Sequence, residues 1–279
     1  QIIFASVSYR RVVADLRLYK HHHMNTYFNI RYEFDKKLVW NRIASQVKAE
    51  KSDYICVADG VVLNIANRKP EYLRVINGGM FSICDSGYVP LYLKWIYGVR
   101  YEQYCGAQIF KDIVSSRKYR MMFMGTSQRT LDGLKNTIKV WNTDVLTMTF
   151  YELPFCDVKE FNYEDIARRV EESEADIIWI ALGAPKQEMF MSKLKPYLKR
   201  GVMIAVGAAF KFYSGTDERR APQWMLKTHL EWVFRIMCSP KKQLKRCSMI
   251  ILTLPRLLIE EIKRKHNKKH NDTINTIYK

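Results

Sequence analysis

The sequence lacks the marks of a disulfide-stapled, metal-bound or membrane-spanning protein. Its six cysteines are scattered, without a Cys-x-x-Cys pair or a Cys/His cluster, which argues against a disulfide scaffold or a zinc module and favours a reduced, cytoplasmic compartment. No stretch approaches the roughly 18 unbroken apolar residues that a membrane span requires, since Pro255 and Arg256 interrupt the nearest candidate, Met249–Ile259. A Walker loop and a Gly-x-Gly-x-x-Gly motif are also missing, so the sequence indicates neither ATP nor NAD.

Charge is unevenly distributed along the chain. The 279 residues carry 46 Lys+Arg and 28 Asp+Glu, a net charge of +18, and 12 basic against 3 acidic residues fall between Arg235 and Lys279. Over residues 235–258, basic and apolar residues alternate as in a basic amphipathic helix. This segment predicts an anionic partner, which is a membrane surface, a lipid diphosphate or nucleic acid, and the alternative is a basic tail that is only solvated.

Composition and local pattern divide the chain into four parts. Residues 1–23 begin without Met and lack the apolar core of a signal peptide, so we expect a non-native or disordered extension before Met24. Residues 24–215 are predicted to form an α/β core, and residues 216–262 a basic helical appendage. Residues 263–279, where the apolar periodicity fades, are predicted to be a frayed basic tail.

Short apolar runs alternate with segments of helical period in the core. We predict strands at Tyr54–Val57, Met80–Cys84, Tyr119–Met124, Leu146–Phe150, Asp176–Leu182 and Val202–Val206. We predict helices at Tyr88–Gly98, Gln128–Trp141, Tyr163–Ser173 and Lys186–Leu198. This alternation predicts an α/β fold with a largely parallel sheet and helices on both faces.

Glycine beside polar or small residues follows five of the predicted strands. These segments are Asp59–Gly60, Asp85–Gly87, Gly125–Ser127, Gly183–Glu188 and Gly207–Phe210. Ligands of parallel sheets sit beyond the carboxyl ends of the strands, and glycine lets backbone N–H groups approach a phosphate. Turn or cap formation explains any one of these segments, whereas the five together predict a site for a nucleoside diphosphate.

Three segments and one spacing carry a resemblance to a known family. The segments are residues 176–190 (DIIWIALGAPKQEMF), 201–215 (GVMIAVGAAFKFYSG) and 219–242 (RRAPQWMLKTHLEWVFRIMCSPKK), and the spacing is that from Asp85 to Gly106. Over residues 53–258 the chain resembles the WecG/TagA/CpsF family of bacterial glycosyltransferases. The resemblance implies a Rossmann-like α/β fold with a basic helical appendage at its carboxyl end.

The resemblance also implies an activity. Family members transfer an N-acetylhexosamine, typically N-acetylmannosamine, from a UDP-sugar to a sugar on undecaprenyl diphosphate, and this builds cell-wall, capsule and other surface polysaccharides. The reaction inverts the anomeric centre and is expected to use no metal and no cofactor. The enzyme is expected in the cytoplasm, peripherally bound to the inner face of the cell membrane.

An inverting transfer needs a base that takes the proton of the acceptor hydroxyl. The resemblance assigns this role to Asp85, for which helix capping is the alternative. Asp59 stands where the family usually has Asn, so we expect it to contact sugar hydroxyls, and it is the rival candidate for the base. Gln187 matches an active-site Gln and is predicted to hydrogen-bond the donor sugar or the acceptor.

Further contacts are predicted around these three residues. The residues expected to bind substrate are Gln103, Gly106, Gln108, Gly125, Thr126, Ser127, Gly183, Lys186 and Gly207. The residues expected to hold the leaving UDP or the lipid diphosphate are Arg219, Arg220, Arg235, Lys242 and Arg246. The residues that depart from the family pattern are Val57, Asp59, Gln103 and Gln108, and they indicate a branch whose substrates differ from those of the best-known relatives.

Two other functions are compatible with parts of the pattern. The net charge alone permits an α/β protein that binds nucleic acid, but the basic residues gather at one amphipathic end and no RNA-binding signature accompanies them. Another nucleotide-sugar enzyme, such as an epimerase or a pyrophosphorylase, is the second alternative, although the missing Gly-x-Gly-x-x-Gly motif argues against an NAD-dependent epimerase. A homo-oligomer is left open.

Overall fold

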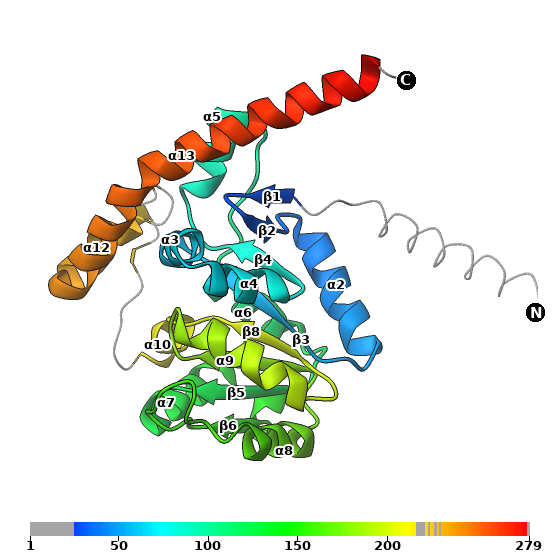
Figure 1. Cartoon of the computed structure of the whole chain (residues 1–279). Coiled ribbons are helices and arrows are strands. Elements are labelled where there is room, and N and C mark those ends of the chain that lie inside the picture. The colour runs from blue at the N-terminus through cyan, green and yellow to red at the C-terminus, as the bar shows by residue number, and fades with distance from the viewer. Residues whose placement is uncertain (1–24, 216–220, 223, 226–227, 229, 278–279) are drawn as a thin grey trace, which may run out of the picture.

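The protein is described here by a computed structural model. It describes residues 25–215, 221–222, 224–225, 228 and 230–277. The extension expected at residues 1–23 lies outside the described residues. In the described part, eight strands form a single sheet, with helices packed on both of its faces (Figure 1).

The sheet is parallel except at one edge. Its strands are β1 (Asn25–Tyr27), β2 (Ile30–Tyr32), β3 (Asp53–Ala58), β4 (Phe81–Cys84), β5 (Met121–Gly125), β6 (Thr149–Tyr151), β7 (Ile177–Ala181) and β8 (Val202–Ala205). They lie in the order β1-β2-β4-β3-β8-β7-β5-β6, and only the β1–β2 pair is antiparallel. The carboxyl ends of seven strands, β2 to β8, therefore point to the same edge.

Helices connect these strands and extend beyond the last of them. The helices of the core are α2 (Lys36–Lys48), α3 (Gly60–Arg68), α4 (Pro70–Gly78), α5 (Val89–Tyr97), α6 (Gly106–Ser116), α7 (Gln128–Ile138), α8 (Tyr163–Ser173), α9 (Lys186–Leu194) and α10 (Ala209–Ser214). Two 3-10 helices, η1 (Thr143–Thr147) and η2 (Lys195–Tyr197), lie between them, and α12 (Glu231–Cys238) and α13 (Pro240–Ile277) follow. Polar caps begin several of these helices; Asp35, for example, accepts hydrogen bonds from the N–H groups of Lys37 and Leu38 at the start of α2.

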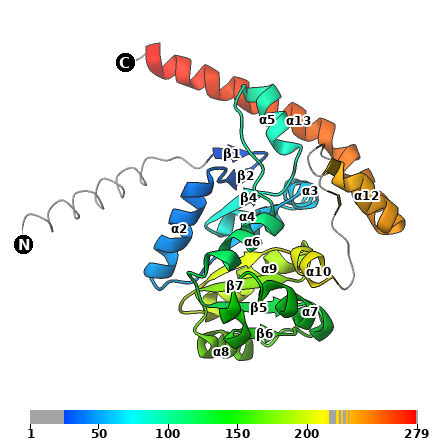
Figure 2. The same cartoon turned by 180° about the vertical axis from the view of Figure 1, so that it is seen from behind.

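Alternation of side chains along each strand builds two cores. In β7, Ile178 and Ile180 pack among residues of α3, α4, α8 and α9, whereas Ile177 and Trp179 pack among residues of α2, α6, α7 and α10. All four side chains are completely buried. A strand that is apolar on both faces needs a helix layer on each side, and Figures 1 and 2 show both layers. The predicted fold class is confirmed.

Helix α13 packs across the β1–β2 side of the core, against α3 and α5 (Figures 1 and 2). The amide of Asn64 on α3 donates to the carbonyl of Met249 at 3.0 Å and to the hydroxyl of Thr253. Further along, the buried carboxylate of Glu261 accepts from the N–H of Phe28 and from the hydroxyl of Tyr97, both at 2.8 Å. These polar contacts fix α13 at two points of its length.

The structure also corrects parts of the sequence prediction. The strand expected at Leu146–Phe150 is wrong in its first half, because the side chain of Asn142 accepts a hydrogen bond from the N–H of Asp144 and opens the 3-10 helix η1. Only residues 149–151 form β6. The helix expected at Lys186–Leu198 is divided at Lys195, immediately before Pro196, which has no N–H to continue an α-helix. Helix α13 is continuous through residue 263, so the expected tail begins without a break in secondary structure.

Candidate active site

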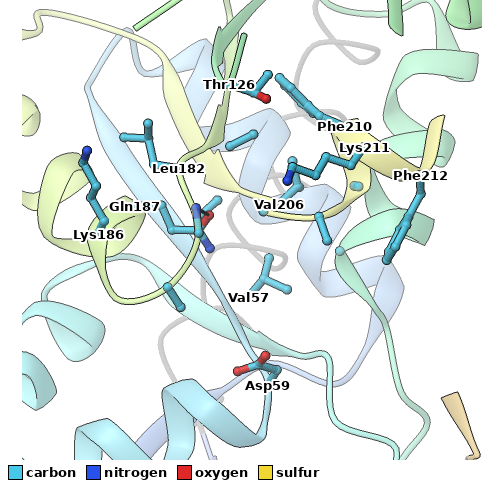
Figure 3. Close-up of a pocket in the computed structure, with 18 of the residues that line it drawn as sticks. Val57, Asp59, Thr126, Leu182, Lys186, Gln187, Val206, Phe210, Lys211 and Phe212 are labelled. Atoms are coloured by element: carbon cyan, nitrogen blue, oxygen red, sulfur yellow. Dashed lines mark hydrogen bonds between the residues drawn. The ribbon is translucent and has the colours of Figure 1, made fainter. Parts of the chain in front are cut away.

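A cavity of about 740 Å³ lies at the edge of the sheet where the parallel strands end (Figure 3). Its wall contains Asp59 after β3, Asp85 after β4, Gly207 after β8, Gly183 after β7, Thr126 after β5 and Pro154 after β6. The order of the strands arranges these residues along the edge. Asp59 and Asp85 therefore lie at one end, above neighbouring strands, and Thr126 and Pro154 lie at the other, where Glu152 adds a third carboxylate to the wall.

Asp85 is held by the start of another helix. One oxygen of its carboxylate, Oδ1, accepts a hydrogen bond of 2.7 Å from the N–H of Gly106, the first residue of α6. The backbone N–H of Asp85 donates to the carbonyl of Ala58 at 3.0 Å, which ties the end of β4 to the end of β3. A helix N-terminus carries partial positive charge and stabilises a carboxylate there. The side chain is thus fixed in position on the cavity wall.

Asp59 caps helix α3, and capping was the alternative that the sequence left open for the segments that follow the strands. Its Oδ1 accepts from the N–H groups of Val61 at 2.9 Å and Val62 at 2.8 Å. Its other carboxylate oxygen has no hydrogen-bond partner among the residues that the structure describes. Figure 3 shows the side chain at the start of α3, facing the cavity below Val57. Capping and a contact with substrate are compatible, because each uses a different oxygen.

Gln187 lies in the cavity wall, 4% exposed, on the first turn of α9. Its side-chain carbonyl accepts a hydrogen bond of 3.0 Å from the N–H of Gly183, and its amide nitrogen donates to Glu188 at 2.8 Å. Glu188 is fully buried and also accepts from the hydroxyl of Tyr72 at 2.9 Å. Burial is the main reason that the pKa of Glu188 is raised to about 7.

Three of the predicted binding residues do not line the cavity. Gln103 instead donates its side-chain amide to the backbone carbonyl of Asp85, and Gln108 donates to the carboxylate of Asp112 at 2.6 Å. Gly125 has φ +107°, and a Cβ there would approach the carbonyl oxygen of Ala181 to 2.7 Å. Its lack of a side chain therefore permits the close pairing of β5 with β7.

The predicted residues that do line the cavity come from seven segments of the chain. They are Asp59, Asp85, Gly106, Thr126, Ser127, Gly183, Lys186, Gln187, Gly207 and Arg246. Lys186 contributes at the outer wall, where its ammonium group donates to the carbonyl of Cys156 and lies 5.4 Å from the ring centroid of Phe155. Gly207 has φ +50°, and the amide of Gln187 packs against it.

Helix α13 brings its basic residues to the cavity from outside the sheet. Gln243 and Arg246, on its first two turns, form part of the wall. Packing of Ile250 against Gly60, the first residue of α3, sets this position. The predicted phosphate ligands Arg219 and Arg220 lie outside the described residues, as do the side chains of Arg235 and Lys242.

Sequence reasoning assigned no individual role to four residues of this region, which are Lys211, Phe155, Glu188 and Tyr72. Lys211 and Phe155 line the cavity, and Lys211 reaches into it from α10 in Figure 3. Lys211 immediately follows the segment Gly207–Phe210 that the sequence singled out, so the same loop signal leads to it. The roles of Glu188 and Tyr72 have no local sequence signal, because their meeting joins α4 to α9.

Comparison with known proteins identifies the family. The model of the glycosyl transferase WecG/TagA/CpsF family matches residues 27–271. The chain belongs to this family. Membership makes the protein a glycosyltransferase and confirms the resemblance drawn from the sequence. It also favours this activity over the alternatives of nucleic-acid binding and of another nucleotide-sugar enzyme.

Two named relatives of this glycosyltransferase are N-acetylglucosaminyldiphosphoundecaprenol N-acetyl-beta-D-mannosaminyltransferases. The enzyme of Bacillus subtilis is 23% identical over 248 residues, which cover 82% of this chain and 90% of the relative. The enzyme of Bacillus spizizenii is 25% identical over 195 residues, which cover 69% of this chain and 74% of the relative. Their names describe an acceptor in which N-acetylglucosamine is carried on undecaprenyl diphosphate.

Two features are absent from the residues that the structure describes. Among those residues, no helix combines the length and apolar character that crossing a bilayer requires. Within the same part of the chain, no three or more His, Cys, Asp or Glu side chains are grouped as a metal site.

Proposed function

We propose that this glycosyltransferase moves an N-acetylhexosamine, and specifically N-acetylmannosamine, from UDP to a sugar carried on undecaprenyl diphosphate. One observation carries the proposal: Asp59 and Asp85 lie side by side at one end of a cavity that Arg246 of α13 also lines. A transfer between a nucleotide sugar and a lipid diphosphate needs a base near the reacting carbon and cations near the phosphates. The names of the two Bacillus relatives support the choice of sugar and acceptor.

In the proposed reaction, Asp85 is the general base. Its carboxylate takes the proton from the acceptor hydroxyl while that oxygen attacks the anomeric carbon of the donor sugar. The bond from that carbon to the diphosphate breaks on the opposite face, so the configuration inverts and UDP departs with the bonding electrons. The hydrogen bond from Gly106 holds one oxygen of Asp85, and this fixes the direction from which the carboxylate approaches the acceptor.

The opposite end of the cavity suits the nucleotide. Thr126 and Ser127 offer hydroxyl groups after β5, and Lys211 extends toward the cavity from α10. We therefore place the UDP over β5, β7 and β8, and the reacting sugar over β3 and β4. In this pose Arg246 and Lys211 stabilise the charge that develops on the departing diphosphate without a metal ion.

Two further side chains are proposed to contact the sugar. Asp59 retains one carboxylate oxygen that the described residues do not engage, and it accepts a hydrogen bond from a sugar hydroxyl. Gln187 offers an amide N–H from the adjoining part of the wall. Asp59 is the rival candidate for the base, because its carboxylate borders the same end of the cavity.

A membrane-facing surface is proposed on the outer side of α13 and α5, and it would bring the cavity to a lipid-linked acceptor. The exposed apolar residues of this surface are Leu91, Trp95, Leu244, Ile251, Leu252 and Ile259. Exposed basic residues on the same long helix are Lys241, Lys245, Arg256 and Lys263. Apolar side chains flanked by cations are typical of helices that lie on anionic bilayers, and this supports the proposed location of the enzyme at the inner face of the cell membrane.

The proposal is tested with the full chain, UDP-N-acetylmannosamine and a short-chain lipid-diphosphate-N-acetylglucosamine acceptor, in EDTA. We expect release of UDP and a lipid product heavier by one N-acetylhexosamine, and the same yield when Mg²⁺ replaces EDTA. UDP-N-acetylglucosamine and UDP-N-acetylgalactosamine are the matched donors, and transfer from either alone would replace N-acetylmannosamine in the proposal. The proposal would be overturned if no sugar is transferred from any of the three donors and UDP does not protect the protein from thermal unfolding.

A further inference from the structure

Glu188 occupies a closed position behind the cavity. Its side chain is completely buried, and it does not itself line the cavity that Gln187 lines. Both carboxylate oxygens are engaged: Oε2 accepts from the hydroxyl of Tyr72 at 2.9 Å, and Oε1 accepts from the amide of Gln187 at 2.8 Å. A carboxyl group without solvent is costly to bury unless such bonds satisfy it. A buried carboxyl group at this position therefore indicates that Glu188 has a function beyond packing.

The bonds around Gln187 select one orientation of its amide. The two ends of a Gln amide are nearly equal in shape, so only hydrogen bonding distinguishes them. Here the N–H of Gly183 requires an oxygen on one side, and the carboxylate of Glu188 requires the nitrogen on the other. Rotating the amide by half a turn would set N–H against N–H at Gly183 and oxygen against oxygen at Glu188. Each contact supports the other.

The fixed amide has one donor left for a ligand. A Gln amide nitrogen carries two hydrogens, and among the described residues only Glu188 accepts one of them. The amide also packs on Gly207, where an added Cβ would lie 3.4 Å from its oxygen and 3.6 Å from its nitrogen. The side chain thus borders the cavity along the strand ends of β7 and β8, and β8 neighbours β3, the strand that Asp59 follows.

We propose that Glu188, supported by Tyr72, is a positioning residue that orients the amide of Gln187 so that its second N–H is presented to an oxygen atom of the bound sugar substrate. The inference rests on the proposed glycosyl transfer. An ionised acceptor binds an amide N–H more strongly than a neutral one does, which explains a carboxylate here in place of a second amide. Tyr72 serves as a dependable donor, since burial raises the pKa of its hydroxyl.

A double-mutant cycle tests whether Glu188 acts through Gln187. We compare Gln187→Met, Glu188→Met and the combined variant, since Met approximates both side chains in length without their polar groups. Glu188→Met is expected to lower kcat/KM by about tenfold alone and by less than about twofold when Gln187 is already Met. Glu188→Gln, which retains an acceptor for the amide, is expected to restore most of the loss. The inference would be overturned if the losses of kcat/KM in the two single variants multiply in the combined variant. It would also be overturned if Glu188→Gln lowers kcat/KM as much as Glu188→Met does.

A second measurement needs no turnover. The side-chain amide resonance of Gln187, assigned by its disappearance in Gln187→Met, is followed by NMR as pH is varied around the Glu188 pKa of about 7. The other titratable groups near Glu188 are Tyr72 on α4, Cys56 on β3 and Asp59 at the start of α3. We expect the resonance to titrate in the wild type and to stay still in Glu188→Gln.

The control is Glu164→Gln, an exposed residue on α8, which should leave that titration and the activity unchanged. An unchanged titration in Glu188→Gln would overturn the positioning role, even in a protein that transfers sugar normally. If the protein transfers sugar from none of the donors but the Gln187 resonance titrates as expected, the proposed function is contradicted and the coupling of Glu188 to Gln187 is established. The two failures are therefore distinguishable.

Discussion

The sheet and helix α13 contribute to the same cavity, but they are built differently. The inner strands of the sheet are buried on both faces, and the carboxylates and the amide follow directly from their ends. Helix α13 lies on the outside of this core, is tied to it by polar contacts at Asn64 and Glu261, and leaves an apolar outer side exposed. Groups that require exact placement thus sit on the rigid part. The positive charge of Arg246, which we propose binds phosphate, arrives on an attached helix.

The largest effect expected on stability concerns a buried carboxyl group in the core. Because the pKa of Glu188 is raised to about 7, its contribution to stability is complete below its ordinary pKa and is lost as pH rises through 7. We expect the free energy of unfolding to fall by roughly 3 kcal/mol more in the wild type than in Glu188→Gln between about pH 4 and pH 8. Urea unfolding of both proteins at the two pH values measures the difference, with Glu164→Gln as the control. Equal pH dependence in all three would contradict the burial of an ionisable Glu188.

The next effect concerns the attachment of α13. Glu261→Ala removes the acceptor of the Phe28 N–H and the Tyr97 hydroxyl, and we expect this to cost about 2 kcal/mol. Hydrogen exchange should then accelerate in α13 while the β7 amides keep their protection. The matched control is Glu260→Ala, the preceding residue, whose surface ion pair with Arg256 is worth only about 0.3–0.5 kcal/mol. Equal acceleration in both variants would show that Glu261 is not an anchor.

An effect of similar size is expected when the side chain that α13 contributes to the proposed UDP-sugar site is removed. Arg246→Ala should lower kcat/KM for the UDP-sugar by roughly 10-fold to 100-fold, because a charge-assisted hydrogen bond to phosphate is worth about 1.5–3 kcal/mol. Arg256→Ala, on the same helix but outside the cavity wall, is the control. Steady-state kinetics with a water-soluble acceptor measure both variants. An unchanged kcat/KM in Arg246→Ala would remove α13 from the donor site.

The smallest effect concerns the outer surface of α13. Leu252→Glu should weaken binding to vesicles that contain anionic lipid by about tenfold, since a bilayer surface buries only part of a side chain whose full burial is worth about 1.5–3 kcal/mol. Its turnover of a water-soluble acceptor should not change. Val140→Glu, an equally exposed apolar position after α7, is the matched control in flotation experiments. If both variants float alike, the membrane surface lies elsewhere.

The sequence predicted the core of the site because parallel strands share one edge. Asp59, Asp85 and Gln187 follow three different strands, and the alternation of strands and helices was sufficient to bring them into one cavity. The directions of individual side chains were beyond such reasoning. Gln103 turns to the backbone of Asp85, because the path of the loop before α6 decides where its amide finds an acceptor.

Contacts between segments that lie far apart in the chain were the other features that the sequence did not predict. Glu188 becomes buried only when α4 packs on α9, and Arg246 reaches the cavity only because Ile250 packs on Gly60. The strands β1 and β2 are three residues each, too short to show a period, and were missed. Helix α8, by contrast, was predicted with its observed bounds, since its apolar positions repeat over three turns and Asn162 marks its start.

The comparison of the two carboxylates under single-turnover conditions tests the central claim most directly. Asp85→Asn and Asp59→Asn each preserve shape and the ability to accept a helix N–H, so a change in rate reports on the lost charge and basicity. We predict that Asp85→Asn slows sugar transfer by roughly 10²–10⁴-fold with little change in donor affinity, and that Asp59→Asn slows it by less than about tenfold. The reverse order would make Asp59 the base and contradict the account.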